Sequence, residues 1–137
     1  MQAVLLDTDV FSFFFKRDSR ASLYAPHLQN ARPCLSFQTV AELRCWAIIK
    51  HWGDARRRSL DEAMRMYIIF PYDDALSRCW ADITAYRRST GRPIECGDAW
   101  IAATATLHGI PIITNNAKDY EGIPGLSVIS HQNDPPS

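Results

Sequence analysis

Short apolar runs alternate with longer amphipathic segments along the chain. The apolar runs predict buried strands, and they lie at 3–6, 34–37, 67–70, 111–114 and 126–129. Apolar positions at helical spacing predict helices at 10–15, 20–29, 39–52, 55–66, 74–90 and 97–108. Strands that alternate with helices predict an α/β fold with a mainly parallel sheet of four to five strands, joined by right-handed crossovers.

Local signals mark several of these boundaries. Gly53 and Gly109 follow the apolar positions of two helices, where glycine commonly ends a helix. Thr39 and Glu42 have the spacing of a capping box at the start of the third helix. Pro26 is expected to kink or end the second helix, because proline cannot donate a backbone hydrogen bond.

Length and composition indicate one globular unit. A chain of 137 residues with 47% apolar and 22% charged residues can bury a core of its own without metal or disulfide bonds. We expect a single domain over residues 1–131 and a frayed C-terminal tail over 132–137. The longest apolar runs are far shorter than the roughly 20 residues of a membrane helix, so no membrane segment is expected.

The net charge of the chain is zero, so any basic surface must be local. Fifteen basic and fifteen acidic side chains cancel, so no overall field attracts nucleic acid. A basic rim around an acidic pocket would also give a net charge of zero. Arg87, Arg88 and Arg92 are candidates to contact nucleic acid on such a rim, and residues 56–58 form a second basic run. A solvated helix face is the alternative for both clusters.

The cysteine pattern argues against zinc. Cys34, Cys45, Cys79 and Cys96 form no C-x-x-C pair and have no histidine at zinc-finger spacing. A chain of this size does not need disulfides, and no secretory signal is apparent. We therefore expect four reduced, mostly buried thiols in a cytoplasmic protein.

The first apolar run is followed by two acidic residues. Residues 3–6 lead directly into Asp7, Thr8 and Asp9. A carboxylate at the end of a buried strand is costly unless donors or a cation compensate its lost hydration. The alternative is that Asp7 or Asp9 caps the following helix.

Three further polar residues are expected at the same place. Asp7 ends the first strand, Glu42 lies early in the helix after the second, Asp98 begins the helix before the fourth, and Asn116 follows the fourth strand. The carboxyl ends of parallel strands share one edge of a sheet, so these four side chains should meet there. Each has a local alternative, because helix caps, the helix dipole and turns also favour these residue types.

A cluster of oxygen ligands without nearby cysteine or histidine suits a hard cation, Mg²⁺ or Mn²⁺. Such an ion can lower the pKa of bound water and neutralise charge on a leaving oxygen. The sequence therefore favours metal-assisted phosphodiester hydrolysis.

Four motifs in this order resemble the PIN-domain family, and within it the VapC-type toxins of bacterial toxin–antitoxin operons. They lie at 5–10, 39–43, 97–105 and 114–126. The resemblance covers nearly the whole chain. It implies an α/β/α sandwich with the activity of a Mg²⁺-dependent endoribonuclease that hydrolyses RNA. It also implies a homodimer and a small antitoxin that holds the toxin inactive.

The resemblance also assigns roles to residues. It implies that Asp7 and Asp98 are the principal metal ligands and that Glu42 completes the catalytic pocket. The family's fourth acid falls at Asn116, whose neutral amide favours one tightly held metal ion.

Three neighbours of these residues are candidates for supporting roles. Asp9 replaces the asparagine of many relatives, and Asp119 can partly compensate for the missing fourth acid. Together with Thr114, they are candidates for support of the first ligands or for a second metal ion.

Two other functions remain open at this stage. The run of apolar residues before Asp7, Thr8 and Asp9 also resembles the start of haloacid-dehalogenase-type phosphatases, in which Asp7 would be the nucleophile. A PIN-like module that binds without catalysis is the third possibility, because the fourth acid is absent.

Aromatic residues give a weaker signal about partners. Phe11, Phe13, Phe14 and Phe15 form more apolar surface than one short helix can easily bury. We expect some of them, Phe13 or Phe14 in particular, to face a second copy or an antitoxin.

Overall fold

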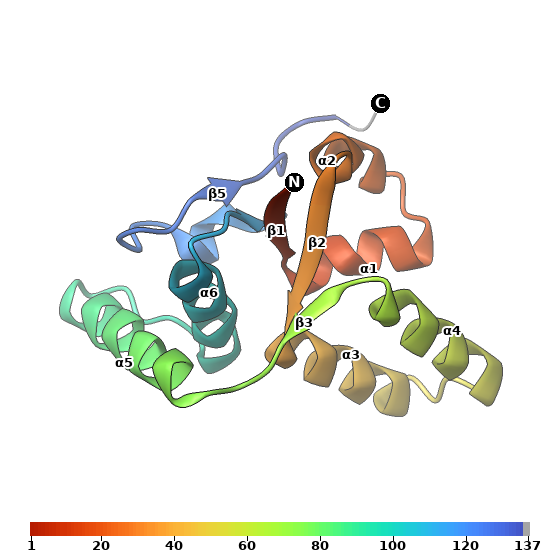
Figure 1. Ribbon diagram of the computed structural model, residues 1–137, viewed down its shortest axis with the longest axis horizontal. Coiled ribbons are helices and arrows are strands. Elements are labelled where there is room, and N and C mark those ends of the chain that lie inside the picture. Colours follow the sequence, from red (N-terminus) through yellow and green to blue (C-terminus); the bar gives the residue numbers. More distant parts are fainter. Residues whose placement is uncertain (136–137) are drawn as a thin grey trace.

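The computed structural model describes residues 1–135, and its centre is a five-stranded sheet in the order β3-β2-β1-β4-β5. Every strand pair is parallel. Figure 1 shows the helices on both sides of this sheet. In chain order the elements are β1 (Gln2–Leu6), α1 (Thr8–Lys16), α2 (Ala21–Leu28), β2 (Ala31–Ser36), α3 (Phe37–Ile49), α4 (Asp54–Arg65), β3 (Ile68–Phe70), α5 (Asp74–Ser89), α6 (Cys96–His108), β4 (Ile112–Ile113), the 3-10 helix η1 (Ala117–Tyr120) and β5 (Val128–Ile129).

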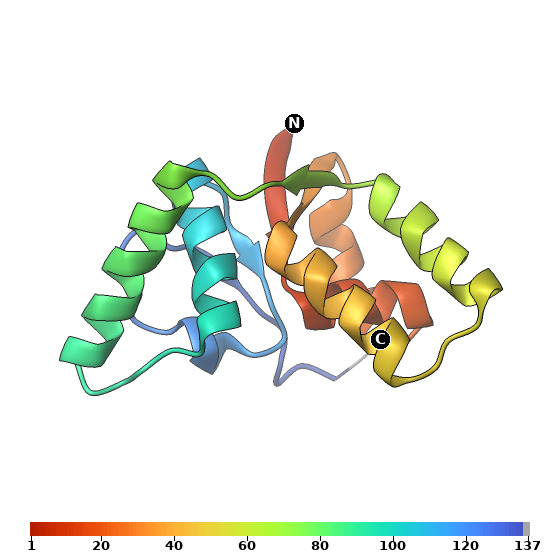
Figure 2. The ribbon, with the colours of Figure 1, turned by 90° about the horizontal axis from the view of Figure 1, so that it is seen from below.

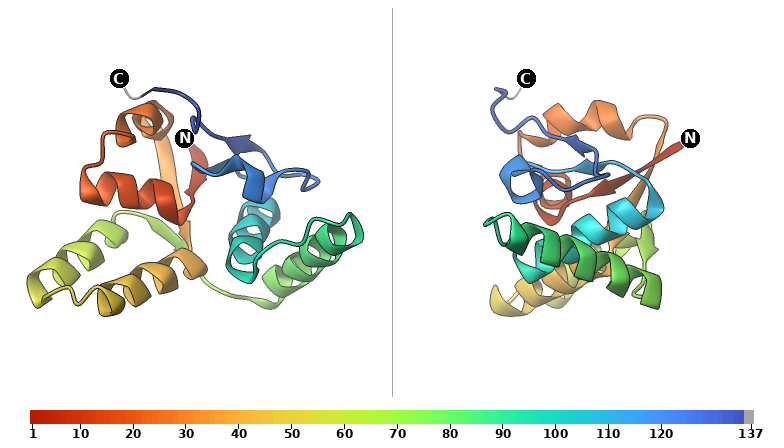
Figure 3. Two further views of the ribbon diagram at one scale, coloured as in Figure 1. Left: turned by 180° about the vertical axis from the view of Figure 1, so that it is seen from behind. Right: turned by 90° about the vertical axis from the view of Figure 1, so that its left-hand side faces the viewer.

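Alternation along β1 divides the interior into two cores. Val4 and Leu6 are buried against apolar residues of α1 to α4, whereas Leu5 is buried against those of α5 and α6. Successive side chains of a strand point to opposite faces, so one central strand serves both layers. Figures 2 and 3 show α5 and α6 on one side of the sheet and α3 and α4 on the other. The predicted three-layer α/β/α sandwich is confirmed.

The chain changes direction in the sheet at β1. It runs from β1 outward to β2 and β3, then returns to add β4 and β5 on the other side of β1. β1 and β4 are therefore neighbours, with Leu6 paired to Ile113. Parallel sheets bind ligands at the carboxyl ends of strands where the order reverses. Here that point lies between Asp7 and Thr114, which directly follow these paired residues.

The third helix begins earlier than its capping-box pattern indicates. Ser36 is the N-cap of α3, and its hydroxyl accepts from the amide of Gln38 at 3.1 Å. Thr39 is buried within the first turn, and its hydroxyl accepts from the Thr8 hydroxyl at 3.0 Å. The capping-box interpretation of Thr39 and Glu42 is therefore wrong, and Glu42 is free for another role.

Two helix ends also differ from expectation. α3 ends at Ile49, and the turn uses His51 in the left-handed conformation at φ 53°, so Gly53 is the N-cap of α4. α2 continues past Pro26 to Leu28. Gly109 ends α6 at φ 63°, as predicted.

The cysteines are free, but they are less buried than expected. Cys34 is buried, Cys79 is half-buried, and Cys45 and Cys96 are exposed. The prediction of mostly buried thiols is wrong, because Cys45 and Cys96 lie on outward helix positions.

The C-terminal segment makes contacts within the fold. The amide of Ala117 donates to the Gln132 side chain at 3.4 Å, and Asp134 contacts His131 at 2.7 Å. Residues 136 and 137 of the predicted tail lie outside the described residues. Over residues 1–135, no helix combines the length and hydropathy that crossing a bilayer requires.

The phenylalanine run of α1 mostly serves the core. Phe11 and Phe13 are 1% and 7% exposed, and Phe14 and Phe15 are half-buried against the same cluster. The expectation that Phe13 faces a partner is wrong, because its ring packs beside Tyr24 of α2, 6.3 Å between centroids.

Phe13 and Phe14 provide a matched test of this packing. We expect Phe13→Ala to lower the free energy of unfolding by about 3–5 kcal/mol, because it leaves a buried cavity. Phe14→Ala should cost about 1–2 kcal/mol, since its side chain keeps part of its contact with water. Urea unfolding monitored by circular dichroism would measure both. Equal losses would contradict the assigned burial.

Candidate active site

Asp7 lies at the point where β1 ends and α1 begins. The Thr8 amide donates to Oδ1 of Asp7 at 2.8 Å, and the Thr114 hydroxyl donates to Oδ2 at 2.8 Å. The side chain is buried, at 7% exposure. Asp7 is thus the N-cap of α1. This does not exclude a ligand role, because each carboxylate oxygen keeps a further lone pair.

A close contact between α6 and α3 brings Asp98 toward Glu42. A Cβ atom at Gly97 would lie 2.9 Å from Nε2 of Gln38 and 3.0 Å from Oε1 of Glu42, so only glycine fits without displacement. Gln38 Nε2 also donates to Glu42 Oε1 at 3.0 Å. The first turn of α6, which carries Asp98, therefore lies directly against the Glu42 carboxylate.

The loop after β4 adds the remaining polar groups. The Asn116 amide donates to Oγ1 of Thr114 at 3.0 Å, and Nδ2 of Asn116 donates to Oδ2 of Asp119 at 2.7 Å. Thr114 in turn donates to Asp7. The carboxylates of Asp7 and Asp119 are thus linked through the Thr114 hydroxyl and through Asn116, which donates once from its backbone and once from its side chain.

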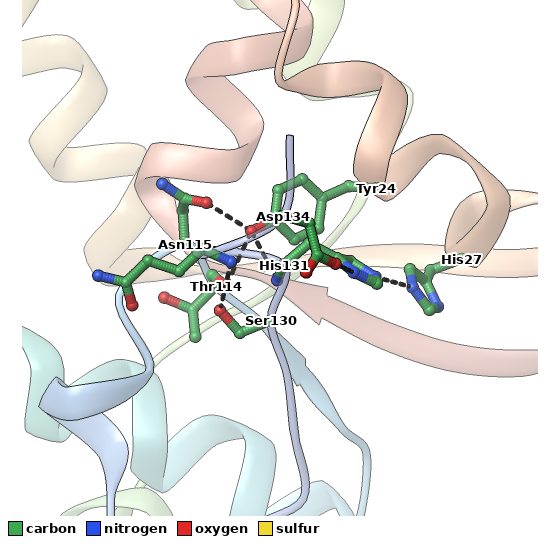
Figure 4. A network of polar contacts seen from close by, with 8 residues as sticks. Tyr24, His27, Thr114, Asn115, Ser130, His131 and Asp134 are labelled. Carbon is green, nitrogen blue, oxygen red and sulfur yellow. Dashed lines mark hydrogen bonds and ion pairs between the residues drawn. The ribbon is translucent and has the colours of Figure 1, made fainter. Parts of the chain in front are cut away.

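A second hydrogen-bond network joins this loop to Tyr24 of α2 and to the C-terminal segment (Figure 4). The Asn115 amide donates to Oδ2 of Asp9 at 3.1 Å, and the Tyr24 hydroxyl donates to Oδ1 of Asn115 at 2.6 Å. The same hydroxyl accepts from the His131 amide at 3.1 Å. Asp9 therefore helps to position the loop, and the C-terminal segment anchors it.

The cluster carries excess negative charge. Burial, followed by the charges of four carboxylates of which Asp119 is the strongest, raises the pKa of Asp98 to about 7. Burial and the charge of Asp7 raise the pKa of Asp9 to about 7. Burial also raises the pKa of Asp7, although the hydrogen bonds from Thr114 and Thr8 oppose the shift. Carboxylates that resist ionisation in this way favour a nearby cation.

The sequence interpretation missed two members of the cluster. Glu95 lies at the N-cap position of α6 without a capping hydrogen bond, and its charge raises the pKa of both Asp98 and Asp119. Its position three residues before Asp98 was the available signal. Tyr120 is buried, and its hydroxyl approaches Asp7 without reaching hydrogen-bond geometry to any described residue. No sequence signal distinguished this tyrosine from a core residue.

The proposed basic rim is smaller than expected. Arg87 is only 5% exposed, and its guanidinium donates to the backbone carbonyls of Arg92, Asp119 and Glu121 at 2.6, 3.1 and 3.2 Å. It holds the loop that carries Asp119, so it does not lie on the rim where we expected it to contact RNA. Arg88 is exposed, and Arg92 is ion-paired with Glu121 at 3.0 Å.

The donor set fits a hard cation with few protein ligands. Within residues 1–135, no three histidine, cysteine, aspartate or glutamate side chains are placed to hold a metal ion by themselves. Mg²⁺ is commonly bound by one or two carboxylates, with water and substrate phosphate as the other ligands. Asp7 and Asp98 are the two carboxylates that would form such a pair, and the charge of Asp7 contributes to the raised pKa of Asp98.

Comparison with known proteins identifies the family. Residues 4–123 match the PIN domain. The chain belongs to the PIN-domain family. One relative of this PIN domain is VapC ribonuclease Y4jK of Sinorhizobium fredii, which is 33% identical over 135 residues, or 93% of this chain and 96% of that protein.

Solved structures share the fold. This PIN domain is similar to a chain of Rickettsia felis VapBC2 bound to a promoter DNA fragment, with a TM-score of 0.83, 19% identity and coverage of 94% of this chain and 98% of that one. It is also similar to a chain of a toxin–antitoxin complex from Klebsiella pneumoniae, with a TM-score of 0.71, 26% identity and coverage of 93% and 96%.

These findings bear on the two other functions. The phosphatase interpretation of Asp7 and the non-catalytic interpretation find no support, because the family and a relative matched over almost its whole length point to a nuclease.

The raised pKa of Asp98 predicts a pH-dependent cost to stability. The folded protein binds this proton more tightly than the unfolded chain, so stability should fall as pH rises from about 4 to about 7. Without metal at about pH 8, we expect Asp98→Asn to be more stable than the wild type by about 1–3 kcal/mol, and the gain should disappear near pH 4.

Urea unfolding in EDTA at both pH values would measure this difference. Asp82→Asn removes an exposed carboxylate of α5 and should change stability by less than about 0.5 kcal/mol at either pH. A destabilised Asp98→Asn at about pH 8 would contradict the assigned electrostatic cost.

Proposed function

We propose that this PIN domain is a metal-dependent endoribonuclease that acts as the toxin of a toxin–antitoxin pair. The observation that carries the proposal is the group of carboxylates around Asp98 at the edge of the sheet where the strand order reverses. Burial, together with the charges of these carboxylates, raises the pKa of Asp98 to about 7. The relatives named VapC ribonucleases support RNA as the substrate.

The residues divide into ligands and positioning groups. Asp7 and Asp98 would hold Mg²⁺, or Mn²⁺ in its place, and such an ion supplies an activated water and neutralises phosphate charge. Thr8 and Thr114 hold the Asp7 carboxylate in one orientation. Preorganised ligands of this kind lose little freedom when substrate binds.

The other polar side chains complete this group. We call the site formed by Asp7, Glu42, Asp98 and Asp119 the carboxylate pocket. Glu42 lies against the start of α6, where Gln38 fixes its carboxylate, and is assigned to orient the attacking water. Asn116 and Asp119 come from the loop after β4 and form a hydrogen-bonded pair, in which Nδ2 of Asn116 donates to Asp119, and the charge of Asp119 acts on Asp98. Because Asn116 is neutral, the position of the fourth acid implied by the resemblance carries no charge, which favours one resident ion.

Cleavage assays test the enzymatic proposal. We expect the purified protein to cut RNA in Mg²⁺ and not in EDTA, and Asp7→Asn and Asp98→Asn each to lower kcat/KM at least about 100-fold. Both replacements keep the shape of the side chain while removing its charge. Asp82→Asn, an exposed carboxylate outside the pocket, should retain wild-type activity.

Thermal unfolding provides an independent measurement. Mg²⁺ should raise the Tm of the wild type and have little effect on Asp98→Asn, because a ligand stabilises only the state that binds it. Cleavage that persists in EDTA, or in both aspartate variants, would exclude the proposed metal site.

The surface is consistent with protein partners. Ile48 and Ile49 at the end of α3 are 61% and 65% exposed, and Ile68 and Ile69 on the edge strand β3 are 45% and 42% exposed. Apolar residues on an open sheet edge favour association with another chain. With the similarity to a toxin–antitoxin complex, they support a small antitoxin partner and a homodimer.

Co-expression tests the antitoxin. We expect the small protein encoded beside this chain to co-purify with it and to suppress RNA cleavage until it is removed by denaturation and refolding. Light scattering of the refolded toxin should give the mass of a dimer. A toxin that remains fully active in the complex would contradict the antitoxin role, and a monomeric toxin would contradict the homodimer.

A further inference from the structure

Three cations meet at the outer end of the helical layer that contains α1, α3 and α4. Lys16 ends α1, Lys50 is the C-cap of α3, and Arg56 lies in the first turn of α4. All three are exposed. Figure 2 shows these ends of α1 and α3 on one side of the molecule, away from α5 and α6.

Aromatic rings hold these cations in place. Nζ of Lys16 lies 5.7 Å from the ring centre of Trp46, and Nζ of Lys50 lies 5.4 Å from the same ring. The Arg56 guanidinium lies 4.2 Å from the ring of Trp52. Both indoles are half-buried against the core, and cation–π attraction restrains side chains that would otherwise be mobile. We call Lys16, Lys50 and Arg56 the distal cation cluster.

The distal cation cluster lacks neutralising acids. In the described part of the chain, none of its three members forms a salt bridge. Asp18 is near Lys16, but it is already paired with Arg20 at 2.9 Å. Partial burial, then contact with Lys50 and the charge of Arg56, lowers the pKa of Lys16. Converging cations that repel one another form a site for an anion.

Two arginines of the basic run at 56–58 have different roles. Arg57 donates to the carbonyls of Trp52 and Ala47 at 2.9 and 3.4 Å, so it fixes the turn between α3 and α4. Arg56 instead extends across Trp52 and Phe15. Of these two arginines, Arg56 is therefore the one that can meet an anion beside the two lysines.

Charge and distance indicate which anion fits. The carboxylate pocket repels RNA, and the net charge of the chain is zero, so attraction must come from a local site. α1 connects the two places, because Asp7 is its N-cap and Lys16, its last residue, lies nine residues after Asp7. At 1.5 Å per residue, the separation is about 14 Å, which a few nucleotides of a bound strand can span.

We propose that Lys16, Lys50 and Arg56 bind RNA backbone phosphates several nucleotides away from the bond that is cleaved. This inference rests on the proposed function. It assigns affinity to the distal cation cluster and chemistry to the carboxylate pocket. The contacts are to phosphates, so they position the strand without reading its sequence.

The test is the salt dependence of cleavage in Mg²⁺ with RNA of about 20 nucleotides. Each phosphate contact on a single strand contributes about 0.7 to the slope of log affinity against log salt concentration. The double variant Lys16→Gln/Lys50→Gln should therefore reduce the slope of log kcat/KM by about 1.4. At physiological salt we expect KM to rise about tenfold.

Two matched variants separate charge from structure. Lys16→Arg/Lys50→Arg keeps both charges and should restore the wild-type slope, whereas a general loss of folding would not be rescued by arginine. Arg78→Gln removes one exposed charge from α5, on the other side of the sheet, and should leave the slope unchanged. Urea unfolding should place all three variants within about 0.5 kcal/mol of the wild type.

The outcomes distinguish this inference from the proposed function. A wild-type protein that cleaves no RNA in Mg²⁺ would overturn the proposed function itself. A wild-type protein that cleaves, together with a glutamine variant of unchanged slope and KM, would overturn only the phosphate site. Normal RNA kinetics with loss of antitoxin binding would reassign the distal cation cluster to the protein partner.

Discussion

The burial of Asp7 between two strand ends is the constraint on which this PIN domain depends. Its carboxylate accepts from the Thr8 amide and the Thr114 hydroxyl, which belong to different strand ends. Hydrogen bonds to an ionised group are stronger than those between neutral groups. Loss of either donor would leave the buried carboxylate without one of its hydrogen-bond partners, which is costly. The contact therefore joins β1 to β4 at the switch point and also orients the central side chain of the site.

The carboxylates around Asp7 work against folding. Burial, followed by repulsion from neighbouring carboxylates, raises the pKa of both Asp9 and Asp98 to about 7. The core must supply the stability that this cluster removes, and the two apolar layers on either side of β1 do so. A cation would relieve the repulsion, which links metal affinity to the same charges that destabilise the metal-free protein.

Opposite charges occupy opposite ends of one helical layer. α1 begins at the carboxylate pocket and ends at Lys16, beside Lys50 of α3. The arrangement also suits α1 and α3, because acids are favoured at helix N-termini and cations at C-termini. A neutral chain thereby carries a strongly acidic site and a basic surface about 14 Å apart without neutralising either.

The sequence by itself determined the layers and the approximate position of the site. Alternating strands and helices predict a parallel sheet, and a parallel sheet places residues such as Asp7 and Asp98 at one edge whatever the details of packing. Tertiary structure decided contacts between residues far apart in the chain, which no local periodicity encodes. It buried Arg87 against three loop carbonyls, turned Phe13 into the core, and placed Glu95 and Tyr120 beside the acids. Residue spacing specifies the face of an element, but the approach of a second element decides whether that face meets water, a carbonyl or another charge.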